Sequence, residues 1–171
     1  MTTGNYEVSW NELGDIEEGR PSLGGSTSVI VYRLFQFSLR HVLEERFGIE
    51  QTDALLRRAG RLAGKEFAAT QLDRSQGVED YLSEVVEKME TLKIGVLRAE
   101  KVDLQSMEFM LTVSEDLDCS GTPVIGRPIC SFDEGFIAGV FERFAGREFD
   151  VREIDCWATG AKTCRFTVRP A

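Results

Sequence analysis

The order of two kinds of hydrophobic periodicity is the feature that most constrains the fold of this chain. Three segments with apolar residues at three- and four-residue spacing come first, at about 29–47, 53–72 and 78–93. Two alternating segments follow, then a fourth helical segment at 131–146 and two more strand-like segments. Because helices and strands occur in separate runs, the sequence predicts an α+β fold, with an antiparallel sheet packed on one face by helices.

Capping residues predict where the helices begin and end. Gly48 is expected to end the first helix, and Thr52 is expected to cap the N-terminus of the second. Ser131 is expected to cap the fourth helix, and Gly146 to follow its last turn. The inner face of the second helix is predicted to contain Leu55, Ala59, Leu62, Ala63 and Phe67.

Two glycines, Gly60 and Gly64, lie inside the second helical segment. Each costs about 1 kcal/mol of helix propensity relative to alanine. Their spacing of four places them on one face, where another backbone can approach closely.

Two cysteines lie on the last pair of strand-like segments. Cys156 and Cys164 are each four residues from Gly160, so a turn centred there makes them face each other. Directly opposed residues have Cβ atoms about 4.5–5.5 Å apart. This geometry suits two thiolates on one zinc ion, a strained disulfide or two small buried side chains.

Composition bounds the partners and the compartment. A net charge of −9 disfavours nucleic acid and acidic membranes as direct partners. No apolar run approaches about 20 residues, and the acidic start of the chain lacks the apolar core of a signal peptide. We therefore expect a cytoplasmic protein whose thiols stay reduced. Residues 1–27 are expected to form a loosely attached arm before a ligand-binding domain at 28–171, with Tyr6 and Trp10 docking onto the domain or a partner.

The C-terminal part carries a more specific pattern. A cysteine precedes a helix with two glycines four apart; a Glu-x-x-Cys strand, a glycine turn and Cys-x-Phe follow. The residues are Cys130, Gly135, Gly139, Glu153, Cys156, Gly160, Cys164 and Phe166. This pattern resembles the 4-vinyl reductase domain family. The resemblance covers roughly residues 28–169 and is specific over 130–168.

The resemblance implies a fold related to subunits of the TRAPP vesicle-tethering complex and to haem nitric-oxide-binding domains. It also implies a zinc ion held by three cysteines and one glutamate, and Cys119 receives no role. Four protein ligands leave no position for water, so such a zinc is expected to be structural. We expect Arg165 or Arg152 to offset the negative charge of the site. By position in the motif, the ligands are Cys130, Glu153, Cys156 and Cys164.

This ligand set makes a demand on the strand. Glu153 and Cys156 point to opposite faces of an ideal strand, so both reach one ion only if the strand is bulged or twisted.

We interpret the chain as a non-catalytic module that binds a hydrophobic, aromatic or tetrapyrrole-like molecule, as a stand-alone sensor or carrier. The sequence has no dinucleotide-binding fingerprint, and its one histidine, His41, is expected at the surface. The resemblance further implies a homodimer formed through helices, and a stand-alone sensor would need a protein partner for signalling. The candidate pocket residues are Tyr81, Phe109, Phe132, Phe136 and Trp157.

Two other functions remain open from the sequence. The family name favours an enzyme, or an enzyme accessory, in the reduction of a tetrapyrrole vinyl group. The vesicle-tethering relatives favour a protein–protein scaffold with a solid core.

Overall fold

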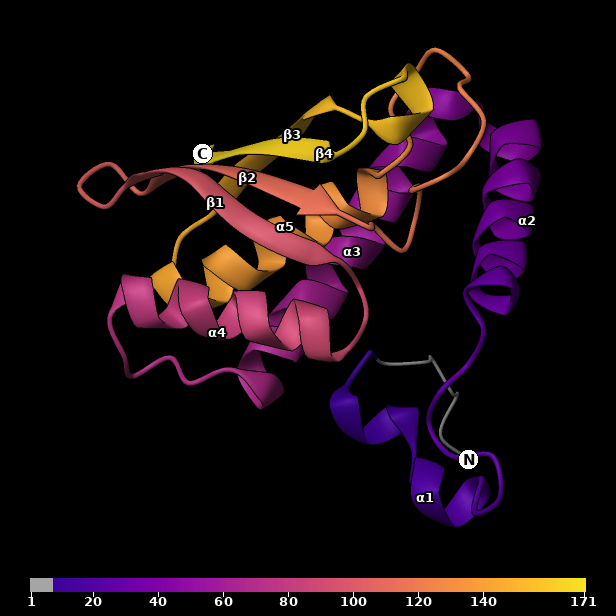
Figure 1. Cartoon of the computed structure of the whole chain (residues 1–171), viewed down its shortest axis with the longest axis horizontal. Coiled ribbons are helices and arrows are strands. Elements are labelled where there is room, and N and C mark those ends of the chain that lie inside the picture. Colours follow the sequence, from indigo (N-terminus) through magenta and orange to yellow (C-terminus); the bar gives the residue numbers. More distant parts are fainter. Residues whose placement is uncertain (1–7) are drawn as a thin grey trace.

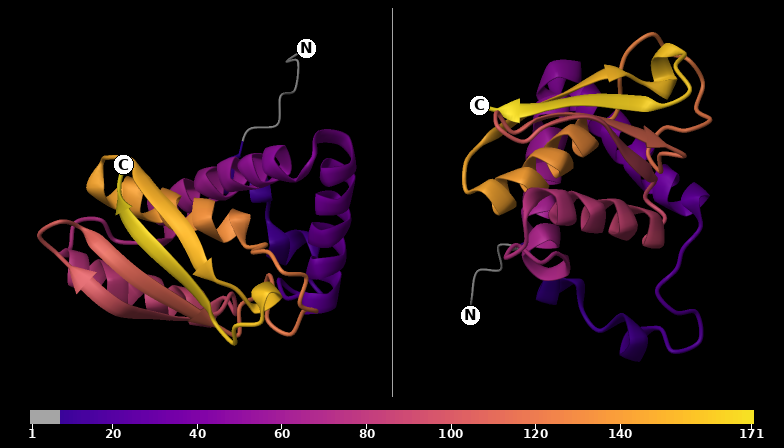
Figure 2. Two further views of the ribbon diagram at one scale, coloured as in Figure 1. Left: turned by 90° about the horizontal axis from the view of Figure 1, so that it is seen from above. Right: turned by 60° about the vertical axis from the view of Figure 1, so that its left-hand side comes forward.

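A four-stranded antiparallel sheet forms one layer of the molecule, and helices cover one of its faces (Figures 1 and 2). The computed structural model describes residues 8–171, so the expected docking of Tyr6 lies outside the described residues. The strand order is β1-β2-β4-β3. This architecture confirms the predicted α+β class. The strands are β1 (Val96–Asp103), β2 (Glu108–Ser114), β3 (Phe149–Asp155) and β4 (Cys164–Pro170).

The helices lie where the periodicity predicts them, but two of them begin at other residues than expected. Gly48 has a φ of 78° and directly joins two helices, which leaves Thr52 fully buried inside the second one. Cys130 occupies the N-cap of the last long helix, so Ser131 is its first helical residue. The elements are η1 (Trp10–Leu13), α1 (Ile16–Gly19), α2 (Val29–Phe47), α3 (Ile49–Gln71), α4 (Val78–Thr91), α5 (Ser131–Ala145) and η2 (Trp157–Thr159).

Helices α3 and α5 pack backbone against backbone. A Cβ atom added at Gly60 or Gly64 of α3 would collide with backbone atoms of α5. A Cβ added at Gly135 or Gly139 of α5 would collide with backbone atoms of α3. The close approach anticipated from the glycine spacing is therefore present.

This contact also changes the predicted inner face of α3. Leu62 is 46% exposed, because the buried side of the helix is the glycine side. Ala59 is exposed as well, and Leu55 and Ala63 are only partly buried. Of the five predicted residues, Phe67 is buried. The buried residues of α3 are Thr52, Gly60, Gly64, Phe67 and Ala68.

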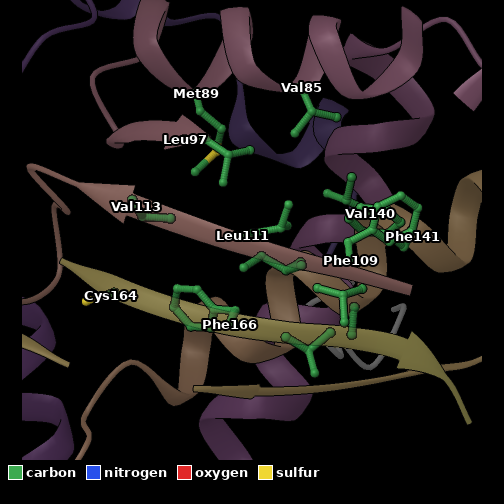
Figure 3. Packing of buried hydrophobic residues seen from close by; sticks show 14 of the residues in the cluster. Val85, Met89, Leu97, Phe109, Leu111, Val113, Val140, Phe141, Cys164 and Phe166 are labelled. Atoms are coloured by element: carbon green, nitrogen blue, oxygen red, sulfur yellow. The ribbon is translucent and has the colours of Figure 1, made fainter. Parts of the chain in front are cut away.

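The main core lies between the sheet and two helices, α4 and α5 (Figure 3). The predicted inner face of α4 is buried at Tyr81, Leu82, Val85 and Met89, with Val86 partly buried. On the facing side of the sheet, alternate residues of β2 point inward, as predicted from their period of two. They are Phe109, Leu111 and Val113.

Helix α2 has the predicted bounds but stands at the edge of the molecule (Figures 1 and 2). Its recurring apolar residues Phe35, Leu39, Val42 and Phe47 are exposed. Despite this apolar surface, no helix within residues 8–171 combines the length and the hydrophobicity needed to cross a membrane.

The segment before α2 makes few contacts with the rest of the chain. Residues 8–28 are exposed except for the partly buried Ser9. The backbone N–H of Trp10 donates to the carboxylate of Glu66 on α3, at 3.4 Å.

The glycine contact makes a prediction with opposing terms. Replacing Gly135 by alanine gains about 1 kcal/mol of helix propensity, yet the new Cβ collides with the Arg57 carbonyl group. Overpacking costs about 1–3 kcal/mol or more when backbone must shift. We therefore expect Gly135→Ala to lower the free energy of unfolding in urea. The control is Gly77→Ala before α4, where an added Cβ meets no atom within 4 Å. A Gly135→Ala protein as stable as this control would contradict the prediction.

Candidate metal centre

Four cysteine side chains from four separate places in the sequence converge at one buried point. Cys119 lies in the segment between β2 and α5, and Cys130 caps α5. Cys156 follows β3, and Cys164 begins β4. All four are free thiols, at most 1% exposed, and their sulfur atoms lie within 4.8 Å of one another.

The distances between these sulfur atoms fit coordination of one metal ion. The Sγ atom of Cys130 is 3.8 Å from that of Cys156 and 3.8 Å from that of Cys164. A tetrahedron of sulfurs at 2.3 Å from zinc has edges of about 3.8 Å. The sulfurs of Cys119 and Cys164 are closer, at 3.1 Å. The donor set and its spacing therefore suit a closed four-sulfur site.

The turn between β3 and β4 orients two of these thiols. The chain does not form a tight hairpin here, because η2 (Trp157–Thr159) follows Cys156. Gly160 closes this turn with a φ of 101°. The Cys156 sulfur accepts the backbone N–H of Thr159. A thiolate at this position is thus stabilised by a backbone donor.

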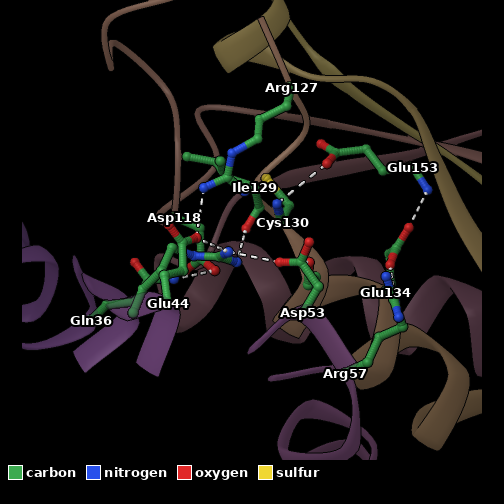
Figure 4. Close-up of polar contacts among 12 residues, drawn as sticks. Gln36, Glu44, Asp53, Arg57, Asp118, Arg127, Ile129, Cys130, Glu134 and Glu153 are labelled. Atoms are coloured by element: carbon green, nitrogen blue, oxygen red, sulfur yellow. Dashed lines mark hydrogen bonds and ion pairs between the residues drawn. The ribbon is translucent and has the colours of Figure 1, made fainter. Parts of the chain in front are cut away.

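Glu153 lies beside the sulfur cluster. Its Oε2 atom accepts the backbone N–H of Cys130 at 3.3 Å (Figure 4). Its Oε1 atom is buried and has no hydrogen-bond partner. Burial, followed by the charge of Cys156, raises the pKa of Glu153 to about 9. The carboxylate is not among the groups within 4.8 Å of one another; Cys119, which had no predicted role, is.

The strand irregularity required by the sequence is present. The register between β3 and β4 shifts between Glu153 and Asp155. This bulge allows Glu153 and Cys156 to approach the same region although their strand parity differs.

Without a metal, the thiols compete for charge. Mutual hydrogen bonds with the other thiols raise the pKa of Cys130 and of Cys164, whereas they lower the pKa of Cys156. The group therefore holds one thiolate, at Cys156, surrounded by S–H donors. A bound divalent ion would replace the other protons, since metal binding requires thiolates.

The expected arginine neighbours bind elsewhere. Arg165 pairs with Asp155 at 2.7 Å and with Glu100 at 3.2 Å. Arg152 pairs with Asp150. Neither pairing places a guanidinium on the sulfurs, so backbone N–H groups such as that of Thr159 remain as the donors.

Carboxylates shape the segment that carries Cys119. The Asp116 side chain accepts the backbone N–H groups of Asp118 and Cys119, at 2.8 and 2.9 Å. Burial and the charge of Asp118 raise the pKa of Asp116 to about 7. Oxygens of Asp116 and Asp133 also lie within 4.8 Å of each other and of the Cys130 sulfur. Asp116 thus fixes the turn that delivers Cys119.

The five candidate pocket residues do not gather at one place. Tyr81 stacks on Phe144 of α5, and its hydroxyl group donates to the Val140 carbonyl oxygen at 2.9 Å. Phe109 contacts Phe141, while Trp157 lies beneath the Lys162 ammonium group. Phe132 is partly buried in the first turn of α5.

Only one of the five, Phe136, lines an apolar cavity between α4, α5 and the sheet. The cavity has a volume of about 10 Å³, so it is nearly filled. The sequence signal for its lining was the helical spacing of apolar residues on α4 and α5, which also describes ordinary core. The lining residues are Val85, Met89, Leu97, Leu111, Phe136, Ile137, Val140 and Phe141.

His41 takes no part in these sites. Its side chain is 72% exposed on α2 and lies 3.5 Å from Glu45, as expected for a surface residue.

Comparison with known proteins places this arrangement in a family. Residues 109–170, which include the four cysteines, match the family model of the vinyl-4-reductase domain. An uncharacterised protein of Methanocaldococcus jannaschii is 28% identical over 158 residues, which cover 92% of this chain and 86% of that protein.

Two solved structures share the fold. The phenol-responsive sensory domain of the transcription activator PoxR, solved with phenol, has a TM-score of 0.65 at 21% identity. The match covers 78% of this chain and 71% of that one. A trafficking protein particle complex subunit 3 from Naegleria fowleri, covalently bound to palmitic acid, has a TM-score of 0.66 at 11% identity. Here 84% of this chain and 95% of the other are covered. The chain therefore contains a vinyl-4-reductase domain, as its resemblance to the 4-vinyl reductase family predicted.

Proposed function

We propose that this protein is a non-catalytic domain that binds a small apolar or aromatic molecule and contains a structural zinc ion. The observation that carries the zinc proposal is the convergence of four buried cysteine sulfurs from four separate chain segments. The reducing cytoplasm expected from the composition would keep these thiols available. A closed site of four protein ligands serves structure, because it leaves no open position for a substrate.

We assign the ligands as Cys119, Cys130, Cys156 and Cys164, with Glu153 outside the ligand set. Four sulfurs already satisfy a tetrahedral ion. Glu153 accepts the Cys130 N–H, so its role would be to orient the first turn of α5 and its thiolate.

The apolar cavity supports the small-molecule part of the proposal. Its lining is wholly apolar, and it lies between α4 and α5 above the sheet. A molecule of phenol size would enter only if α4 moved away from α5. The contacts that would have to yield are the Tyr81–Phe144 stacking and the bond from the Tyr81 hydroxyl to Val140. The phenol-bound PoxR domain, which shares the fold, favours an aromatic ligand.

Substitution of single ligands tests the zinc site. Elemental analysis of the purified protein should give about one zinc per chain. Cys119→Ser should weaken zinc binding by more than the roughly 10- to 100-fold typical of an outer partner, and should lower the melting temperature. Glu153→Gln, of equal size, should retain zinc at the same stoichiometry.

The reverse result would change the ligand assignment. If Glu153→Gln loses zinc while Cys119→Ser keeps it, the ion is held by three cysteines and the glutamate. A wild-type protein that contains no metal and is fully stable would contradict the structural role itself.

Binding of aromatic probes tests the cavity. Phenol, indole or naphthalene should raise the melting temperature by several degrees at concentrations well above the dissociation constant. Val85→Phe fills the cavity and should abolish this rise. The control is Val86→Phe, a change of the same size at a residue outside the lining, which should keep the rise. An equal rise in both variants would place the ligand elsewhere. Turnover of a vinyl tetrapyrrole with reduced nicotinamide would instead support the reductase alternative.

A further inference from the structure

Helix α2 is amphipathic in the reverse sense for a helix packed on a domain. The residues that it turns toward the rest of the chain are Tyr32, Arg33, Gln36 and Arg40, which we call the inner stripe. The opposite side of a 3.6-residue helix carries the outer face, which consists of Val31, Leu34, Phe35, Ser38 and Val42.

The apolar side chains of the outer face are in solvent. Leu34 is 66% exposed, Phe35 67% and Val42 58%. Nine large apolar side chains of α2 are exposed in all, and together they present on the order of the 800 Å² that one partner contributes to a standard protein interface. Such a patch marks an interaction site.

A second copy of this chain fits the patch. The chain carries 29 acidic residues and a net charge of −9, so two copies repel each other over most of their surfaces. Residues 29–43 contain no acidic residue, which makes the outer face a surface where copies approach without that repulsion. The midpoint of α2 is Ser38, a small residue that allows close contact at a two-fold axis. Antiparallel pairing about Ser38 brings Leu34 of one copy opposite Val42 of the other.

The inner stripe holds the segment that carries Cys119. The Arg33 guanidinium donates to the carbonyl oxygens of Leu117 and Asp116, at 2.7 and 3.2 Å. The Tyr32 hydroxyl and the Gln36 amide donate to the two carboxylate oxygens of Asp118, at 2.7 and 2.6 Å.

The inner stripe also holds the segment that carries Cys130. Arg40, which is 9% exposed, donates to the Ile129 carbonyl oxygen at 2.8 Å and to Asp53 at 2.7 Å (Figure 4). Ser131 donates to the same Asp53 oxygen at 2.9 Å. Residues directly before two of the four sulfurs are therefore bonded to one side of α2.

We propose that α2 pairs with α2 of a second copy through its outer face, and that its inner stripe couples this pairing to the cysteine cluster. A rotation or shift of α2 moves the carbonyl and carboxylate groups that position Cys119 and Cys130. Metal binding and dimer formation then strengthen each other by the same factor, because coupling between two binding equilibria is reciprocal. The coupling rests on the metal site proposed above, whereas the pairing does not.

Sedimentation velocity of the full chain tests the pairing. The wild type should be a dimer, and Leu34→Glu should be a monomer with an unchanged far-ultraviolet circular dichroism spectrum. The matched control is Leu62→Glu on the exposed side of α3, which should remain a dimer. A wild-type monomer at tens of micromolar, or a dimeric Leu34→Glu protein, would overturn the pairing. This measurement stands even if the protein binds no metal, so the two proposals fail separately.

The dimer dissociation constant, measured with zinc and after chelation, tests the coupling. Chelation should weaken the wild-type dimer by roughly 5- to 150-fold, the usual range of allosteric coupling. Gln36→Ala and Arg33→Ala remove bonds of the inner stripe and should reduce this dependence while the outer face stays intact. In the metal-free state, Cys119 and Cys130 should react faster with a thiol reagent in Leu34→Glu than in the wild type. A dissociation constant that is indifferent to zinc, with equal thiol reactivity, would overturn the coupling.

Discussion

The direct contact between the backbones of α3 and α5 is the interaction on which the rest of the structure depends. Four glycines remove every Cβ atom from the interface, and buried carboxylates flank it. Glu142 of α5, with a side chain only 4% exposed, pairs with Arg61 and Lys65 of α3. A buried carboxylate that lost these partners would be strongly destabilising, so the ion pairs fix the position at which the helices meet. This contact sets where α5 begins, and Cys130 lies at that point.

The sulfur cluster organises the part of the chain that has no regular structure. The segment 115–130 is long for a connection inside a compact domain, and long connections are usually functional. Cys119 ties its first half to β4, and Cys130 ties its end to β3 and β4. The inner stripe of α2 holds the same segment from the other side. A metal ion at the sulfurs would therefore order a loop and link it to a helix at the edge of the molecule.

The sequence predicted what depends on periodicity and missed what depends on close neighbours in space. The α+β order, the bounds of α2 and the inner face of α4 follow from spacing alone. The bulge near Glu153 was required by the motif and is present in β3. Thr52 looked like a cap because its side chain suits one, yet Gly48 turns the chain so sharply that α3 starts earlier. Cys119 had no motif partner in the sequence, since its approach to Cys164 depends on how the segment 115–130 folds back.

The reversed polarity of α2 follows from the same limit and has a mechanical consequence. Periodicity identifies an apolar side on a helix but does not say whether that side covers the chain's own core or another molecule. In α2 the intramolecular contacts are hydrogen bonds to backbone carbonyls and to Asp118, which depend on direction. Apolar packing tolerates small rotations better than such bonds do, since it is non-directional. A helix held by directional bonds on one side and free to bind through apolar groups on the other transmits small movements from its outer face to the bonded loops.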